Sequence, residues 1–231
     1  MIVVVGLPAY AEGQDGHPCA EGLAVHIAAA ARERGSDVEL VGKVGDDGAG
    51  DAVVVALGRA GVGHAALLRD PARPTPVMAP AGDANGAGDA NGAGDANGAG
   101  DEAPDDERPL VLFPADPADR PGLEAGDVEL ALRYVTGARV VVVADPLSDQ
   151  ALAAAAEGAS FSSARLVVLM PAGAPAPSLP GEATVLEMPA SDDGSFGRLL
   201  GLFAAALDSG LGPGLAFSQA VEASGWEAVG G

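Results

Sequence analysis

Short apolar runs separated by alanine-rich segments constrain the fold of this chain more than any other feature of its sequence. The runs at residues 2–5, 139–144 and 166–170 consist almost entirely of aliphatic residues. Strands without polar alternation are buried on both faces, which is typical of a parallel sheet covered by helices. We therefore predict an α/β fold whose mostly parallel sheet has its central strands at residues 2–5, 37–41, 139–144 and 166–170.

The segments between these strands carry the apolar periodicity of helices, and several of them end at glycine. They predict helices at residues 21–34, 51–60, 127–134, 148–157, 197–207 and 213–223. Further short strands are expected within residues 62–78, at 110–113 and at 183–186, whereas 12–19 and 42–50 predict a loop and a turn. Strands and helices alternate along the 231 residues, which indicates a single three-layer domain.

The charge balance limits the partners that a chain like this can have. Asp and Glu number 33 against 12 Lys and Arg, so the net charge is −21. This surplus argues against nucleic acids and anionic membranes as partners. Cys19 is the only cysteine, and no apolar run reaches the roughly 18 residues of a membrane span. We therefore expect a cytoplasmic protein without disulfides.

A repeat interrupts the α/β pattern. Asp-Ala-Asn-Gly-Ala-Gly occurs three times within residues 83–100. A segment without large apolar residues cannot offset the entropy of ordering by burial, so residues 82–108 are predicted to form a flexible acidic insertion. The Asp and Asn oxygens would also suit Ca²⁺, although their spacing does not complete an EF-hand loop and no Glu closes the set.

Residues 41–51, Val-Gly-Lys-Val-Gly-Asp-Asp-Gly-Ala-Gly-Asp, connect a strand to a helix that Asp47 can cap. Arg-Glu-Arg-Gly precedes this connection, and Gly-Arg-Ala-Gly-Val and Arg-Asp-Pro-Ala-Arg-Pro-Thr-Pro-Val follow it. This order, continuous over residues 21–78, resembles the N-terminal third of the ribokinase/PfkB carbohydrate kinase family. Residues 110–173 are compatible with the family's middle, and 207–211 resemble the start of its closing helices.

The resemblance implies a ribokinase-like three-layer fold, shortened between Met170 and Ala183, with a small lid near residues 64–113. It also implies phosphorylation of a hydroxymethyl group on a sugar or nucleoside, with ATP and Mg²⁺ as cofactors. Where the family binds sugar through a Gly-Gly pair and an Asn, this chain has Gly22 and His26 as the candidate substrate-binding residues. A histidine packed on an alanine-rich helix is the alternative interpretation of His26.

The motif that carries phosphoryl transfer in the family, Asp-Thr-x-Gly-Ala-Gly-Asp, is altered here. Aligned on the following helix, it matches Ser-Asp-Asp-Gly-Ser-Phe-Gly at residues 191–197. The candidate anion-binding residues, at the N-terminus of that helix, are then Gly194, Ser195 and Gly197. Gly197 stands at the general-base position and offers no proton acceptor, and Phe196 replaces a glycine and is expected to crowd the anion.

Asp193 is the candidate substitute base, although the pair Asp192 and Asp193 equally suits a helix cap. Asp145 ends a buried strand, at the edge where α/β folds bind ligands. The family's Asn-x-x-Glu motif for Mg²⁺ is not found, and we assign no metal ligands. Three hypotheses remain: a small-ligand-binding member that is weakly active or non-catalytic, an active kinase with an unrecognised base, and a non-enzymatic scaffold or homodimerisation module.

Overall fold

A six-stranded parallel sheet forms the centre of the molecule, as the apolar runs predict. The computed structural model describes residues 1–13, 15–80, 110–175, 177, 179, 183–189 and 194–225. The strands are β1 (Ile2–Val5), β4 (Val38–Gly45), β5 (Leu67–Asp70), β8 (Val140–Val143), β9 (Arg165–Met170) and β10 (Ala183–Glu187). They follow the order β10-β9-β8-β1-β4-β5, and every neighbouring pair is parallel. The prediction of a mostly parallel sheet is confirmed.

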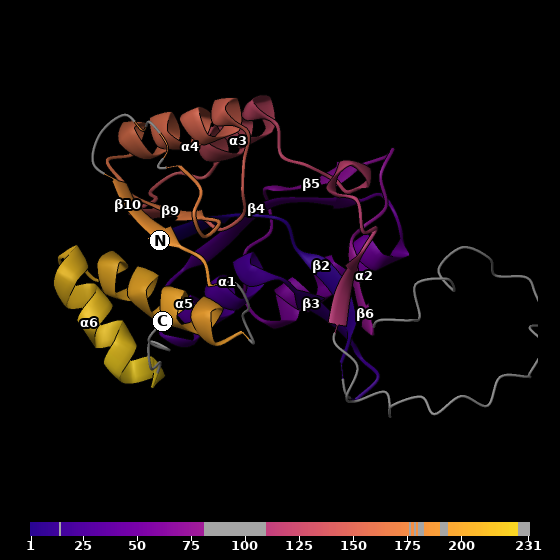
Figure 1. The fold of residues 1–231 in the computed structure, drawn as a ribbon, viewed down its shortest axis with the longest axis horizontal. Coiled ribbons are helices and arrows are strands. Elements are labelled where there is room, and N and C mark those ends of the chain that lie inside the picture. Colours follow the sequence, from indigo (N-terminus) through magenta and orange to yellow (C-terminus); the bar gives the residue numbers. More distant parts are fainter. Residues whose placement is uncertain are drawn as a thin grey trace, which may run out of the picture.

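Helices cover both faces of this sheet (Figure 1). One face carries α3 (Ala125–Tyr134) and α4 (Asp149–Phe161), and the other carries α1 (Leu23–Glu33), α5 (Ser195–Asp208) and α6 (Pro213–Ser224). The remaining helix, α2 (Gly48–Arg59), packs on the same side as α1. Alternate residues of β1 and β8 belong to two separate cores: Ile2 and Val4 face α1 and α5, whereas Val3 and Val5 face α3 and α4. A strand with a core on each side must be apolar throughout.

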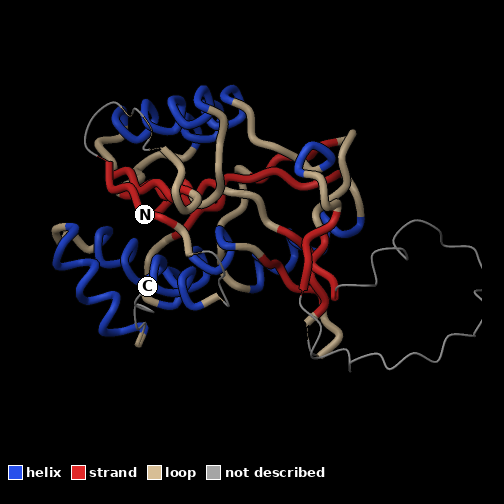
Figure 2. The backbone as a smooth tube through the Cα atoms, viewed as in Figure 1, coloured by secondary structure: helices blue, strands red, loops and turns tan. Residues whose placement is uncertain are grey.

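A second, four-stranded sheet lies beside the first (Figure 2) and forms the lid. Its order is β3-β2-β6-β7, built from β2 (Ala9–Glu12), β3 (Pro18–Glu21), β6 (Val77–Pro80) and β7 (Leu110–Phe113). The lid is therefore larger than the predicted region near residues 64–113, and β5 belongs to the main sheet instead.

The loop expected at residues 12–19 is the connection of a hairpin, and only its ends, Glu12 in β2 and Pro18 and Cys19 in β3, belong to strands. Its strands have four residues each, too short for the alternation of buried Ala9 and Ala11 with Tyr10 and Glu12 to stand out in the sequence. Pairing with β6 stabilises the hairpin, and that contact is invisible to local patterns. The repeat at residues 83–100 and the predicted insertion at 82–108 lie outside the described residues.

The connection after β4 fixes the lid to the main body. Asp47 caps α2 by accepting a hydrogen bond from the Gly50 N–H at 2.8 Å, as the sequence predicts. Its carboxylate also accepts the Thr75 N–H and hydroxyl at 2.8 and 2.6 Å, just before β6 enters the lid. Burial alone would raise the pKa of Asp47, but these hydrogen bonds outweigh it and lower the pKa. Within the described residues, no helix is long and apolar enough to cross a membrane.

Candidate functional site

The carboxyl ends of β1 and β8 form the point of the sheet where a ligand is best accommodated. The chain leaving β1 passes through the lid hairpin into α1 on one face, whereas the chain leaving β8 enters α4 on the opposite face. Neighbouring strands whose connections diverge to opposite faces leave a crevice between them. In this fold the lid sheet begins directly after β1, so it starts at this same end of the parallel sheet.

Asp145 lies at this crevice, two residues after the end of β8. Its Oδ2 accepts the Leu7 N–H at 2.7 Å and so joins the loops that follow β1 and β8. The close approach needs Gly6, because a Cβ there would lie 2.5 Å from Oδ2 and 2.6 Å from the Cβ of Ala24. Removal from water raises the pKa of Asp145 more than the Leu7 N–H lowers it.

Gly22 and His26 lie where β3 of the lid leads into α1. Gly22 precedes the first residue of α1 with φ 110°, a conformation that favours glycine, and a Cβ there would lie 3.2 Å from the Leu7 carbonyl oxygen. The Nε2 of His26 lies 2.8 Å from Oε2 of Glu21, the last residue of β3. Both side chains are about one-third exposed, at 35% and 31%, so they remain within reach of a ligand.

Glu21 belongs to the site, although the sequence did not single it out as a binding residue. It replaces the first glycine of the family's Gly-Gly pair. The hydrogen bond from His26 outweighs burial and lowers the pKa of Glu21. Cys19, on the same strand, donates to the Ala11 carbonyl oxygen at 3.4 Å, and burial, reinforced by the charge of Glu21, raises its pKa. The only sequence feature that could have predicted the Glu21–His26 contact is their spacing, with an acidic residue five positions before a histidine at the start of a helix.

The N-terminus of α5 packs against the same turn of α1. Gly194 caps α5 in a left-handed conformation with φ 90°, and Ser195 is the first helical residue. A Cβ on Gly194 would lie 3.5 Å from the His26 ring, and one on Gly197 would lie 2.6 Å from the Cβ of His26. The structure therefore brings His26, Gly194 and Gly197 together, while their role in binding stays a prediction. Asp193 lies outside the described residues.

Phe196 does not occupy the place that the alignment gave it. Only 6% of this residue is exposed, and it belongs to the core shared by α1, α5 and the sheet. Because α5 begins at Ser195, position 196 lies in the first turn and faces the sheet. The expectation that Phe196 crowds an anion at the helix N-terminus is therefore wrong.

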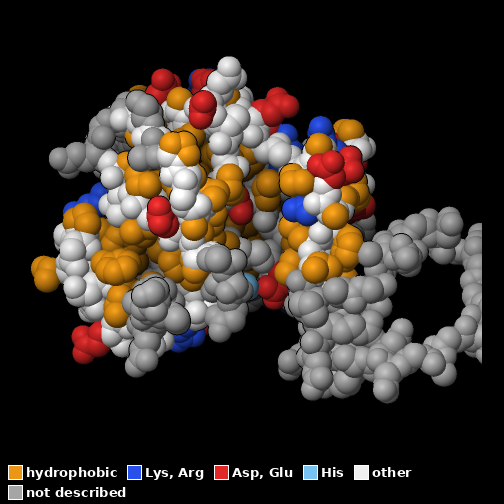
Figure 3. Space-filling model, in the orientation of Figure 1, with side chains coloured by type: hydrophobic (Ala, Val, Ile, Leu, Met, Phe, Trp, Pro, Cys, Tyr) orange, Lys and Arg blue, Asp and Glu red, His pale blue; other side chains and the backbone are white. Residues whose placement is uncertain are grey.

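The described residues do not fit the Mg²⁺ that the resemblance implies. Mg²⁺ takes oxygen ligands, commonly carboxylates, and no group of three or more His, Cys, Asp or Glu side chains in the described part of the chain could hold a metal ion. The lone lysine, Lys43, points away from α5: its Nζ lies 2.5 Å from Oδ2 of Asp127 on α3. Figure 3 shows acidic side chains spread over the visible face rather than gathered in one patch.

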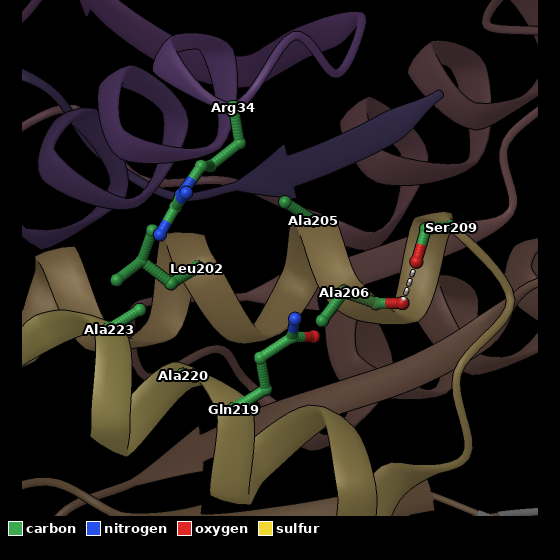
Figure 4. A pocket seen from close by; sticks show the side chains of 8 residues that line it. All are labelled: Arg34, Leu202, Ala205, Ala206, Ser209, Gln219, Ala220 and Ala223. Atoms are coloured by element: carbon green, nitrogen blue, oxygen red, sulfur yellow. Dashed lines mark hydrogen bonds between the residues drawn. The ribbon is translucent and has the colours of Figure 1, made fainter.

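A cavity of about 280 Å³ lies between α5 and α6, far from this edge (Figure 4). It adjoins the C-terminal ends of α1 and α5, whereas His26 and Gly194 lie at their N-terminal ends. Half of the residues that line it are alanine, and Arg34 is the one charged residue among them; the Ser209 hydroxyl donates to the Ala206 carbonyl oxygen at its rim. Small side chains between two helices account for this space.

Comparison with known proteins identifies the fold. The chain matches no protein-family model and no curated protein sequence. A putative ribokinase II from E. coli, in complex with ATP and Mg²⁺, aligns with a TM-score of 0.60 and 12% identity over 95% of this chain and 89% of its own. Arabidopsis thaliana ribokinase, complexed with ribose and ATP, aligns with a TM-score of 0.58 and 14% identity over 96% and 90%.

An uncharacterized sugar kinase from Pyrococcus horikoshii aligns over 73% of this chain and 52% of its own length, with 16% identity and a TM-score of 0.46. This chain thus spans about half of that protein. At such identities the alignments of high coverage establish the architecture alone. The molecule has the ribokinase-like α/β fold in a shorter form, and its described residues form a six-stranded parallel sheet and six α-helices.

Proposed function

We propose that this protein binds a small polar ligand, a sugar or a nucleoside, under its lid and transfers phosphate slowly or not at all. One observation carries the proposal: Gly197, at the position that the resemblance gives to the general base, is packed against α1 with no room for a side chain. A substitution that adds a carboxylate there would have to separate α1 from α5. Packing therefore favours glycine where phosphoryl transfer requires a proton acceptor.

Ligand binding is supported by the polar groups at the start of α1. Glu21 and His26 present a carboxylate and an imidazole edge, which can exchange hydrogen bonds with hydroxyl groups, and the lid strand β3 carries Glu21. The Arabidopsis neighbour binds ribose, which suits a polyhydroxy ligand for this fold. Gly22 keeps the backbone open beside these side chains.

Weak or absent catalysis is supported by what the described residues lack. General-base help is worth about 10²–10⁴-fold and one anion-hole donor about 10²–10³-fold. ATP and Mg²⁺ are the cofactors that the resemblance implies, and the E. coli neighbour holds both. The described residues offer no carboxylate cluster for Mg²⁺, and the chain is short between Met170 and Ala183, where the family carries much of its nucleotide-binding half. We expect ATP–Mg²⁺ to bind weakly.

A phosphotransfer screen tests the catalytic half of the proposal. Purified protein is incubated with ATP–Mg²⁺ and a panel of sugars and nucleosides, and ADP release is followed. Turnover of order 1 s⁻¹, the low end of common enzyme rates, contradicts the proposal. If that activity disappears in Asp193→Asn but not in Asp192→Asn, Asp193 is the substitute base; if both variants stay active, the base lies elsewhere.

Thermal denaturation with the same panel tests the binding half. A ligand that binds the folded state raises the melting temperature. We expect one class of sugar or nucleoside to do so, and His26→Ala to abolish the rise. His64→Ala is the matched control, because His64 lies in the loop between α2 and β5 and contacts the Val62 carbonyl oxygen. No response to any ligand, together with a dimer in solution, would favour the scaffold hypothesis.

A further inference from the structure

A second cavity opens at the carboxyl ends of β8 and β9, on the α4 side of the sheet. Its volume is about 440 Å³, which is within the range of small-molecule sites. Its walls come from the ends of the two strands, the first turn and a half of α4 and, after β9, Pro175, Pro177 and Leu179; among the described residues they also include Val143, Leu147, Leu152 and Met170. The proposed sugar site lies on the opposite face of the sheet, where β3 of the lid leads into α1.

Asp145 is the polar group of this cavity that is best placed to meet a ligand. One carboxylate oxygen, Oδ2, accepts the Leu7 N–H at 2.7 Å. Within the described residues, Oδ1 receives no hydrogen bond and Asp145 forms no ion pair. A desolvated carboxylate is unfavourable without an opposite charge, and because burial outweighs the hydrogen bond from Leu7, the pKa of Asp145 is raised. A ligand that supplies a positive charge would remove it.

The charges of the residues around the cavity determine whether a cationic or an anionic ligand is favoured. Asp145 and Asp149 line it, and no Lys, Arg or His does. The N-terminus of α4 contributes a partial positive charge of about +0.5, which offsets only part of the two carboxylates. A phosphate or carboxylate ligand would meet net repulsion here, whereas a cation is attracted by the cavity and by the surplus of acidic residues in the whole chain.

We propose that this cavity binds a small organic cation. Its ammonium or amidinium group contacts the free oxygen of Asp145, and its short hydrocarbon body packs against Leu147, Leu152 and Met170. The polar contact gives orientation, and the apolar walls supply the larger part of the contact area. This site is separate from the sugar or nucleoside site at Gly22 and His26, so either can exist without the other.

Three probes of matched shape test the proposal: n-butylammonium, n-butanol and butyrate, each titrated at constant ionic strength. Binding is followed by calorimetry and by NMR of ¹³C-methyl methionine, because Met170 lines the cavity and the chain has only four Met residues. Met170→Leu identifies its signal. We expect n-butylammonium to shift the Met170 signal and to bind roughly tenfold or more tightly than n-butanol, because its hydrogen bond to Asp145 is charged.

Asp145→Asn separates the polar contact from the fold, since the amide oxygen still accepts the Leu7 N–H. We expect this variant to lose the preference for the cation, while Asp149→Asn, at the rim, loses roughly threefold or less. Equal binding of n-butanol, preference for butyrate, or a cation response that survives in Asp145→Asn overturns the proposal. His26→Ala is expected to leave n-butylammonium binding unchanged, which distinguishes this site from the proposed sugar site.

Discussion

The two faces of the sheet are packed in different ways, although both are covered by helices rich in alanine. On the α1 and α5 face, glycines of α5 bring two helix backbones together: a Cβ on Gly201 would lie 2.5 Å from the Ile27 carbonyl oxygen and 2.9 Å from the Ala31 nitrogen. On the α3 and α4 face, Gly158 of α4 meets a side chain instead, with its added Cβ 2.6 Å from the Leu132 Cδ1.

The difference in helix packing matches the difference in free space between the two faces of the sheet. A Cβ at Gly197 would lie 2.6 Å from the His26 Cβ and 3.3 Å from the Leu23 Cδ1, so side chains of α1 fill the space beside the first turn of α5. On the opposite face, the carboxyl ends of β8 and β9 border a cavity that contains Asp145. Close packing of α1 against α5 therefore leaves little room for a side chain at Gly197 or Gly201.

Gly201→Ala is expected to have the largest effect, because neither backbone atom it meets can move independently. We predict a loss of about 3 kcal/mol in the free energy of unfolding, measured by chemical denaturation. The same substitution at Gly214, in α6, meets no atom within 4 Å and should instead stabilise the protein by about 0.5–1 kcal/mol. Equal effects at the two positions would show that α1 and α5 are not in close contact.

Asp47→Ala removes the polar anchor of the same face. The variant loses the cap of α2 and leaves the Thr75 N–H without its acceptor, in a place where Thr75 is only 2% exposed. We expect a loss of about 2 kcal/mol, from capping and from the unsatisfied donor together. Asp46→Ala, one residue earlier and exposed, is the control and should change the free energy of unfolding by less than about 0.5 kcal/mol.

Gly158→Ala tests the other face with the same chemical change as Gly201→Ala. The Leu132 Cδ1 can rotate away and the Leu132 Cβ, 3.0 Å from the added Cβ, requires only a small shift, while alanine favours the helix, so the loss should be about 1 kcal/mol. The comparison of the two faces fails if Gly158→Ala proves as costly as Gly201→Ala under the same denaturation conditions.

The smallest expected effect is a pH dependence of opposite sign on the two faces. The pKa of Glu21 is lowered on folding, so its stabilisation is present above its ordinary value and is lost as the pH falls through the folded pKa. The pKa of Asp145 is raised, so its contribution is favourable below its ordinary value and is lost as the pH rises through the folded pKa.

Unfolding measured between about pH 3 and pH 6, which brackets the ordinary carboxyl values, checks both signs. Relative to wild type, Glu21→Gln should become less stable as the pH rises, whereas Asp145→Asn should become more stable. Parallel curves for the two variants would contradict the environments described for the two carboxylates.

The local sequence was sufficient to predict the strands that are buried on both faces of the sheet and the helices beside them. Uninterrupted Val and Ile residues identified β1 and β8 because a strand buried on two faces has no polar positions. Periodic alanines followed by glycine identified α1, and the acidic residue before α2 identified its cap. The order of motifs between residues 21 and 78 was enough to suggest the ribokinase-like fold, which the structural comparisons establish.

Tertiary structure decided what depends on residues far apart in the chain. The hairpin of β2 and β3 is stabilised by pairing of Tyr10 with Val77 of β6, so four-residue strands of weak pattern form on either side of the expected loop. The alignment with the family motif placed Phe196 at an anion site. Because α5 begins at Ser195, the Phe196 side chain instead packs in the core. The close contact of Gly197 with His26 is likewise visible only in the structure, because a glycine in the sequence does not show which atoms lie beside it.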